Sequence, residues 1–542
     1  MGNFDQDLTG SALNRRNFLK YTGILGAAVS ISAGLAACGS TGSTNSSGKP
    51  LGTAAKPAGT ITATAAFLLS SGFDPMNASS AVATAVNQHI FEALIDLDPV
   101  SRKPYLALAA AQPQPSKDGL TWTVRLRNDA VFSDGAPVTA DDVAWSFTRT
   151  LDPKNAALCA SFISFIDSVK ASGKNQVTFK LKSPFPLFSE RISVIKIVPK
   201  AKTATPALAK AFDTNPIGSG PFKLDSSSAT SGCVMSNNAA YTGPRPALVT
   251  KIVLNTSTDN AARLNDLRGG QSQAIEAVPY LDVSGLGDSF QVDDKQAFNC
   301  LFLMFNCSAA PFNDKRVRQA LFYAIDTQKV IDAALSGYGT PATSYLDEGN
   351  ANYQKASTVY DYDPDKAKQL LAAAGASNLS FELVTTDTGF VTDCAPIIID
   401  AWKEIGVTAR LNTNPSAAVY GNIVPANSFR VLAASGDPSV FGVDADLLLR
   451  WYYYGDTWVK DRMRWSGPAQ QKATRLLDQA ARSSGSAQTT AWKQVFDLVA
   501  DEAPLYPVLH TKTVTASDPT SLTNFHGAAT TGLYFLGVGR QD

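Results

Sequence analysis

DGLTWTVRLRNDAVFSDGAPVTADDVAWSF, residues 118–147, places a strand, two turns and the start of a helix next to one another in the chain. Apolar residues alternate with polar ones from Leu120 to Leu126, which is the period of a strand with one buried face. Thr139 is followed three residues later by Asp142, the spacing at which each side chain can reach the other residue's backbone N–H in a capping box. The stretch therefore predicts a half-buried strand followed by a capped helix, as in an α/β protein.

The same alternation of strands and helices continues along the chain. The unbroken apolar run 301–305 predicts a strand that is buried on both faces. One long helix with a single apolar stripe is predicted from Asn313-Asp314 to Ile325, and another is predicted from Asp363-Pro364 to Gly375. Further half-buried strands are predicted at 177–181, 252–254 and 379–383. About 485 residues beyond the N-terminal segment exceed what one hydrophobic core accommodates, so we expect two large lobes.

The N-terminus has the pattern of an export signal. Arg15-Arg16 precede a Gly/Ala-rich apolar run that ends at Ala37 and is too short and too poor in bulky residues to span a membrane. The paired arginines are typical of the twin-arginine export route. The run leads into Cys38 within Leu-Ala-Ala-Cys, a lipobox pattern in which the cysteine is lipidated and becomes the first mature residue. We therefore predict a removed signal over 1–37, and a Gly/Ser/Thr-rich flexible tether over 38–57.

Composition bounds the function of the mature body. Residues 1–37 hold three of the 47 basic and two of the 47 acidic residues, so 44 and 45 remain, a net charge of −1. This balance does not favour nucleic acid as a partner. Beyond Cys38 the cysteines number five, so a complete set of disulfides is impossible within one chain, although a single bridge is compatible with the count. No CxxC pair suggests zinc or redox chemistry.

The chain shows no pattern that indicates catalysis. Its three histidines, His89, His510 and His526, lie in no HExxH motif, and neither GxSxG nor GxxxxGK[ST] occurs. Gly218-Ser219-Gly220 lies between prolines and is interpreted as the turn that leads into a strand. We therefore expect no enzyme activity, no catalytic residue, no metal site and no cofactor.

Several phrases resemble the family 5 extracellular solute-binding proteins of ABC transporters, whose members bind dipeptides, oligopeptides, nickel complexes and some sugars. The resemblance runs from about residue 58 to 540, with its phrases in the family's order. These phrases are Asp118–Val143, Pro216–Phe222, Pro311–Asp326, Tyr362–Gly375 and Asp501–Pro504.

The resemblance implies a bilobal periplasmic-binding-protein fold, of type II in its large three-subdomain variant, with a hinged cleft between the lobes. Lobe I would span 58–297, with an inserted subdomain over about 96–210, and lobe II would span 298–512. Residues 513–542 would return to lobe I. Two crossings between the lobes would form the hinge, and the solute would be enclosed in the cleft.

The resemblance also implies where the solute binds. In peptide-binding members a lobe II aspartate meets the peptide's ammonium, but Ala434 takes that place here, with Asp437-Pro438 following. Because a buried ammonium needs a partner, either Asp437 or another carboxylate replaces the aspartate, or the ligand has no free α-ammonium. The aromatic run 451–454 either lines the cleft or fills the core. We predict these ligand-binding residues: Ser79, Ser80, Asn306, Gly436, Asp437, Trp451 and Tyr453.

The expected function is that of a monomeric lipoprotein on the outer, periplasmic side of the cell membrane. It would capture a peptide or other small organic solute and deliver it to the permease and ATPase subunits of an ABC importer. Two alternatives stay open. The same scaffold could serve a solute sensor or surface chaperone, or the receptor could take a sugar or metal complex in place of a peptide.

Overall fold

A computed structural model describes residues 56–541, and these residues lie within one compact unit, Lys49–Asp542. Its centre is an 11-stranded mixed sheet with the order β15-β14-β16-β12-β17-β11-β1-β10-β9-β8, with β13 on the side of β17. The strands on one side are β1 (Thr60–Ala65), β8 (Phe222–Ser228), β9 (Gly232–Asn237), β10 (Lys251–Thr256) and β11 (Ala274–Ile275). Those on the other side are β13 (Gly339–Pro341), β14 (Ser380–Thr386), β15 (Thr408–Asn414) and β16 (Val431–Gly436). We call the first side lobe I and the second lobe II.

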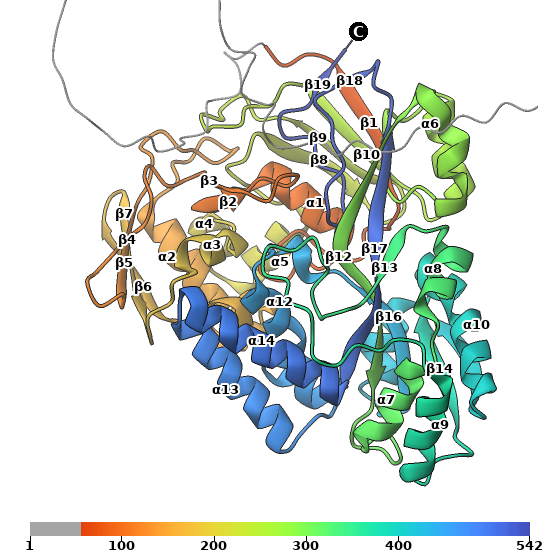
Figure 1. Cartoon of the computed structure of the whole chain (residues 1–542). Coiled ribbons are helices and arrows are strands. Elements are labelled where there is room, and N and C mark those ends of the chain that lie inside the picture. The colour runs from red at the N-terminus through yellow and green to blue at the C-terminus, as the bar shows by residue number, and fades with distance from the viewer. Residues whose placement is uncertain (1–55, 542) are drawn as a thin grey trace, which may run out of the picture. The chain divides into compact units, whose positions relative to one another are not determined.

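Two long strands connect the lobes. β12 (Gln291–Phe305) and β17 (Leu505–Ser517) pair antiparallel from one lobe into the other, and Figure 1 shows them side by side through the middle of the molecule. Their pairing shifts register between Gln296 and Cys300, where the ladder of hydrogen bonds is interrupted and strands bend most readily. The expected lobe boundaries, 297/298 and 512/513, fall inside these two strands.

A second, four-stranded sheet is attached to lobe I. It has the order β4-β5-β7-β6 and lies on the opposite side of Figure 1 from α9 and α10. The predicted strand at 120–126 is β5, and the predicted capping box begins α2 with both hydrogen bonds present. The elements of this region are β2 (Ile95–Leu97), β3 (Pro104–Leu106), β4 (Gln114–Pro115), β5 (Thr121–Arg125), β6 (Ile166–Gly173), β7 (Gln176–Leu181), α2 (Ala140–Leu151), η1 (Pro153–Asn155), η2 (Leu158–Ile163), α3 (Phe188–Arg191) and η3 (Ile192–Val194).

Helices cover both lobes. In lobe I these are α1 (Ala81–Ile90), α4 (Lys200–Thr203), α5 (Pro206–Thr214), α6 (Asn260–Arg268) and η4 (Tyr280–Ser289), with the short strands β18 (Leu522–Thr523) and β19 (Gly539–Arg540) near the C-terminus. In lobe II they are α7 (Lys315–Tyr323), α8 (Thr327–Leu335), α9 (Pro364–Ala373), α10 (Gly389–Glu404), α11 (Ser416–Ala418), η5 (Val419–Ile423), η6 (Pro438–Val440), α12 (Ala445–Tyr453), η7 (Thr457–Arg462), α13 (Pro468–Arg482) and α14 (Gly485–Glu502).

The helix predicted to start at Asn313-Asp314 is confirmed as α7, which Asp314 caps and which ends at Tyr323. The chain forms α7 and α8 with a break between them, because the Asp326 side chain accepts a hydrogen bond from the Lys329 backbone N–H and so begins a new helix. The helix predicted from Asp363-Pro364 is confirmed as α9, and Gly375 follows it at φ +67°.

Glycines 218 and 220 make a close backbone contact, as the interpretation of this turn required. A Cβ at residue 218 would lie 1.8 Å from the Ile90 carbonyl oxygen, and one at residue 220 would lie 2.5 Å from that of His89. The turn therefore presses β8 against the end of α1, which fixes the helix on the lobe I sheet.

The hydrophobic cores show how closely the lobes approach. The lobe I sheet has a core of its own, whereas buried residues of the β4–β7 sheet belong to the same cluster as the core of lobe II. The two lobes therefore contact each other along the inserted region, and the side chains at that contact form the candidate site.

Candidate functional site

The candidate site lies where β16 of lobe II ends. β14 pairs parallel with both β15 and β16, so the carboxyl ends of these strands meet at one edge of the sheet, where loops of α/β proteins commonly bind ligands. Gly436 is the last residue of β16, and a Cβ there would lie 1.9 Å from the Tyr452 hydroxyl. Glycine thus allows Tyr452 to reach the strand end, beside Asp437.

Asp437 joins the two lobes. Its Oδ2 accepts hydrogen bonds from Thr530 Oγ1 (3.0 Å), Thr531 N (3.0 Å) and Thr531 Oγ1 (2.9 Å). Its Oδ1 accepts from the backbone N–H (3.2 Å) and the hydroxyl of Ser439. Lobe I holds the threonine segment in place, because Gly532 N donates to Glu276 at 2.7 Å. A carboxylate offers about four acceptor positions, so these five donors occupy Asp437 fully.

Arg102 supports the same contact from lobe I. It adopts φ +58°, and its guanidinium donates to the Ser439 carbonyl oxygen of lobe II. Burial lowers the pKa of this guanidinium, while the nearby charges of Asp437 and Asp98 oppose that shift. A positive and a negative group therefore face each other across the interface.

A buried ion pair network forms a second bridge between the lobes. Arg191, at the end of α3, donates to Asp444 Oδ1 at 2.6 Å and to Asp446 Oδ2 at 3.0 Å, both at the start of α12. Only 1% of the Arg191 side chain and none of Asp446 is exposed. Arg450 also holds Asp446, at 2.9 Å. The two negative charges of lobe II are thus neutralised by one arginine from each lobe.

Aromatic rings complete the interface. Phe162 of lobe I stacks on Trp451 with ring centroids 5.6 Å apart and an interplanar angle of 18°, and it also contacts Phe441 at 5.5 Å. Trp451 in turn contacts Tyr452 and Trp458, both at 6.4 Å. The predicted residue Trp451 therefore lies at the boundary between the lobes.

Behind this boundary, lobe II holds an arginine on two aromatic rings. The Arg462 guanidinium carbon lies 4.0 Å from the centroid of the Trp458 ring and 4.6 Å from that of Tyr420. Trp458 also packs against Tyr452 with centroids 4.6 Å apart. We call Tyr420, Tyr452, Trp458 and Arg462 the Arg462 cluster. Burial lowers the pKa of Arg462.

The structure assigns different places to the other predicted ligand residues. Ser79 is exposed, whereas Ser80 is buried and its hydroxyl caps α1 by accepting from the Ala83 N–H at 3.4 Å. Ser71 Oγ accepts from the backbone N–H of both residues. Ser80 thus has a structural role, whereas Ser79 is exposed to solvent.

Asn306 and Tyr453 are both completely buried in lobe II. Asn306 Nδ2 donates to the Phe429 carbonyl at 3.2 Å, and its Oδ1 accepts from Ser308 Oγ at 2.8 Å. The Tyr453 hydroxyl donates to the Leu505 carbonyl of β17 at 2.6 Å. Both side chains thus form hydrogen bonds within lobe II. Ala434 is likewise completely buried in β16, opposite Phe302.

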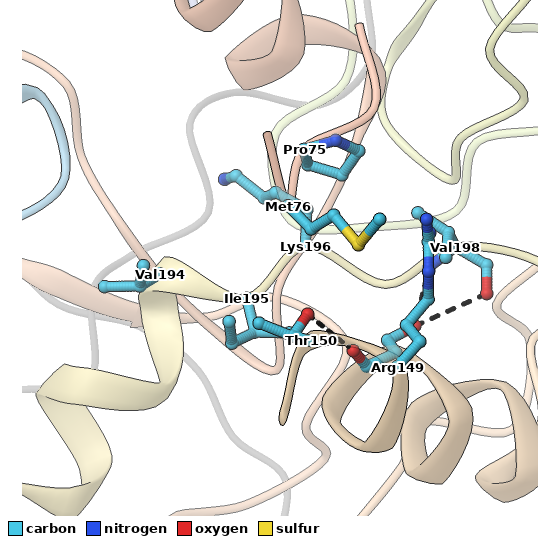
Figure 2. A pocket seen from close by; sticks show the side chains of 9 residues that line it. Pro75, Met76, Arg149, Thr150, Val194, Ile195, Lys196 and Val198 are labelled. Atoms are coloured by element: carbon cyan, nitrogen blue, oxygen red, sulfur yellow. Dashed lines mark hydrogen bonds between the residues drawn. The ribbon is translucent and has the colours of Figure 1, made fainter. Parts of the chain in front are cut away.

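Two pockets lie away from the interface. One, lined in Figure 2 by Met76, Arg149 and Lys196 among others, has a volume of about 10 Å³, room for roughly one water molecule. The other, about 170 Å³, lies within lobe II beside Asp326, Thr343 and Tyr360. The first is too small for an organic solute, and the second receives no residue from lobe I.

The histidines are placed by folding requirements. His89 is buried between α1 and the C-terminal segment, where its Nε2 accepts from the Phe535 N–H at 2.9 Å, and burial lowers its pKa to about 4. His510 is buried with Nδ1 2.9 Å from the Phe298 carbonyl oxygen, and His526 is exposed. Within residues 56–541, no group of three or more His, Cys, Asp or Glu side chains is placed to hold a metal ion.

The cysteines of the described part of the chain are all free thiols: Cys159, Cys233, Cys300, Cys307 and Cys394. Burial raises the pKa of Cys159 to about 12, so this thiol stays protonated at neutral pH. Arg15, Arg16 and Cys38 lie outside the described residues, as does most of the expected tether. Among the residues described, no helix combines the length and apolar character needed to cross a bilayer.

Sequence patterns missed four residues of the interface: Arg102, Arg191, Tyr420 and Arg462. Arg191 and Asp444 are 253 residues apart in the chain, so no local spacing connects them. Arg102 adopts a positive φ in a turn, and no sequence motif marks an arginine at such a position. The one available signal was the pair Trp458 and Arg462 at i and i+4, which can stack on a helix.

Comparison with known proteins agrees with this architecture. Residues 103–458 match the model of the bacterial extracellular solute-binding proteins, family 5. The glutathione-binding protein GsiB of Shigella flexneri is 25% identical over 472 residues, covering 85% of this chain and 91% of that protein.

Solved structures show the same fold. AgaA from A. tumefaciens R10, in complex with agropinic acid, superposes with a TM-score of 0.78 at 23% identity over 89% of this chain and 99% of that chain. DppA from Helicobacter pylori, in complex with the peptide STSA, has a TM-score of 0.80 at 20% identity over 90% and 98%. NikZ from Campylobacter jejuni, in complex with Ni(L-His), has a TM-score of 0.74 at 22% identity over 86% and 96%. The expected fold is thus confirmed, and the chain belongs to the family 5 bacterial extracellular solute-binding proteins.

Proposed function

We propose that this protein captures a small organic solute between its two lobes and delivers it to the permease of an ABC importer. The observation that carries the proposal is the pair of long strands, β12 and β17, that form the sheet crossing between the lobes. A receptor of this kind needs ligand contacts from both lobes, because only then does binding favour the closed arrangement over the open one.

The facing surfaces of the two lobes contact each other directly. Lobe I contributes Arg102, Phe162 and the threonine segment at 530–531, and lobe II contributes Asp437 and Trp451. Ion pairs and hydrogen bonds across the interface form only when the lobes approach, so they stabilise the closed arrangement around a bound solute.

The class of solute is proposed from the relatives' own ligands. Their names and titles give glutathione, agropinic acid, a nickel–histidine complex and a short peptide. A solute of similar size, a peptide or another small organic molecule, is what we expect here. No chemical step on the solute is proposed, because the interface residues are occupied in contacts between the lobes.

Native mass spectrometry of the protein purified from its own cells tests this function. We expect one small solute per chain, released when the protein is unfolded and rebound after refolding. A protein that carries no solute, and whose melting temperature is unchanged by glutathione, dipeptides, agropinic acid and nickel–histidine, would contradict the proposal.

We further propose that the N-terminus exports and anchors the protein. The Arg15-Arg16 signal would direct export through the twin-arginine route, and acyl chains on Cys38 would hold the mature protein at the outer face of the membrane. Anchoring keeps the receptor near its transporter and raises its effective concentration there.

Cell fractionation tests the anchor. Cys38→Ala should move the protein from the membrane fraction to the soluble extracytoplasmic fraction, and Arg15→Lys with Arg16→Lys should leave it in the cytoplasm. A Cys38→Ala protein that remains in the membrane fraction would contradict lipid anchoring at this residue.

A further inference from the structure

The Arg462 cluster is a set of hydrogen-bond donors without an acceptor. Among the residues that the structure describes, the Arg462 guanidinium donates no hydrogen bond and forms no ion pair within 4 Å. The hydroxyls of Tyr420 and Tyr452 likewise have no hydrogen-bond partner there. The side chains come from three separate elements, η5, α12 and η7.

The side chains of the cluster pack against one another. Arg462 stacks on both Tyr420 and Trp458, and the rings of Tyr420 and Trp458 are 5.8 Å apart at 70°. Tyr452 packs on the same Trp458 ring at 4.6 Å. The Tyr452 hydroxyl reaches Gly436 at the end of β16, which places the cluster next to Asp437 and the lobe boundary.

The stacking prepares Arg462 for an anion. The rings of Trp458 and Tyr420, inclined at 70° to each other, contact the half-buried guanidinium and displace part of its water, while its N–H groups have no partner among the described residues. The neighbouring acid, Asp461, is exposed and makes no ion pair with it. An arginine held in this way pairs best with a carboxylate, which accepts two parallel N–H bonds.

Asp437, by contrast, has no room for a cation. Its two oxygens already accept five hydrogen bonds from Ser439, Thr530 and Thr531, and Arg102 lies nearby. A ligand ammonium would have to displace these bonds. Arg462, by contrast, has no ion-pair partner among the described residues.

We infer that the Arg462 cluster is the anion subsite of the solute, where a carboxylate of the ligand binds the half-buried Arg462 guanidinium beside the hydroxyl of Tyr420. This inference rests on the proposed function and narrows its ligand class to small organic carboxylates that need no free ammonium. The ring of Trp451, beside the cluster, offers an apolar surface for the rest of the molecule.

Isothermal titration with matched ligands tests the subsite on the wild-type protein. The probes are glutathione, agropinic acid, N-acetyl-dipeptides with a free carboxylate, the same N-acetyl-dipeptides as carboxamides, and dipeptide amides that carry only an ammonium. We expect the tightest ligands to carry a carboxylate, and the matched carboxamide to bind at least tenfold more weakly. Carboxamides or ammonium-only probes that bind as tightly as carboxylates would overturn the inference.

Substitutions test the same subsite by a second route. Arg462→Gln should weaken carboxylate binding at least tenfold and leave carboxamide binding unchanged, and Arg462→Lys should restore only part of the affinity because it lacks the planar fork. Arg475→Gln, on an exposed arginine of α13, is the control and should bind as the wild type does. Equal carboxylate affinity in Arg462→Gln would overturn the inference. If Arg462→Gln fails to fold, the ligand series on the wild-type protein still decides whether the subsite prefers a carboxylate.

The two levels of proposal fail differently. A wild-type protein that binds none of the probes and carries no solute contradicts the proposed function, and the anion subsite falls with it. A protein that binds a solute with no preference for carboxylates leaves the receptor function standing and contradicts only the subsite.

Discussion

Replacing Arg191 with methionine removes the positive charge that lobe I contributes to the ion pair network between the lobes. The side chain is 1% exposed, and it holds Asp444 at 2.6 Å and Asp446 at 3.0 Å. Breaking a buried ion pair from one side costs about 3–5 kcal/mol, because the remaining charge is left without its partner. Arg450 still holds Asp446 at 2.9 Å, so we expect the lower end of this range, about 3 kcal/mol.

The effect should also reach the arrangement of the lobes. Arg191 and its acidic partners lie on opposite lobes, and about 3 kcal/mol corresponds to roughly a hundredfold change in an equilibrium constant. The equilibrium between closed and open lobes should therefore shift towards the open form in Arg191→Met. Urea unfolding measures the first effect, and the radius of gyration from small-angle X-ray scattering of the solute-free protein measures the second.

Arg316→Met is the matched control. Arg316 pairs with Asp314 at 2.6 Å within lobe II, but the two side chains are 45% and 30% exposed. A surface pair of this kind contributes about 0–1 kcal/mol, and its loss cannot affect the lobe contact. The reasoning is refuted if Arg191→Met unfolds at the same urea concentration as Arg316→Met and scatters like the wild type.

Three further substitutions test other parts of the structure. Burial raises the pKa of Glu92 to about 7, with Arg127 opposing, so protonation of Glu92 between pH 7 and 4.5 favours the folded state. The free energy of unfolding of the wild type relative to Glu92→Gln should therefore rise by about 3 kcal/mol from pH 8 to pH 4.5. Equal pH profiles of the two proteins in urea titrations would contradict this. Ala434→Asp places a carboxylate opposite Phe302 in the middle of the sheet, so it should lower the free energy of unfolding by several kcal/mol and create no dipeptide affinity. A stable variant with improved dipeptide binding would show instead that this position faces a ligand. Gly218→Ala forces a Cβ to 1.8 Å from the Ile90 carbonyl oxygen and should destabilise the folded protein by at least about 1–3 kcal/mol. The control Gly389→Ala, whose Cβ would meet nothing within 4 Å, should leave the stability unchanged. Similar melting temperatures for the two variants would argue against the close contact of β8 with α1.

Local sequence patterns predicted the elements that depend on neighbouring residues. Thr139 and Asp142 are three residues apart, and both partners of the capping box are contained in that spacing. The same holds for α9, which begins at Asp363-Pro364 and is followed by Gly375. The helix predicted after Asp314 is α7, and the cap at Asp326 starts the next helix, α8.

The interface depended on contacts that local patterns do not contain. Trp451 and Tyr453 differ by two positions in α12, about 200° around the helix axis, so one lies at the lobe boundary and the other is completely buried. The choice between these faces is made by packing against Phe162, far away in the chain. Tyr420 and Arg462 are brought together in the same way, by two separate segments of lobe II.

Asp437 illustrates an open question that the structure narrows. The family resemblance left three possibilities for the missing ammonium partner: Asp437, another carboxylate, or a ligand without a free α-ammonium. The occupied oxygens of Asp437, which contact Thr530 and Thr531 of lobe I, disfavour the first of these.

Hydrogen–deuterium exchange tests most directly whether the solute binds between the lobes. The exchange of the solute-loaded protein is compared with that of the same protein after unfolding and refolding have removed the solute. If the solute binds between the lobes, amides should gain protection on both sides of the interface, in lobe II at 436–441 and 457–462 and in lobe I at 528–534. Protection confined to one lobe, or confined to the lobe II pocket beside Asp326 and Tyr360, would contradict binding between the lobes.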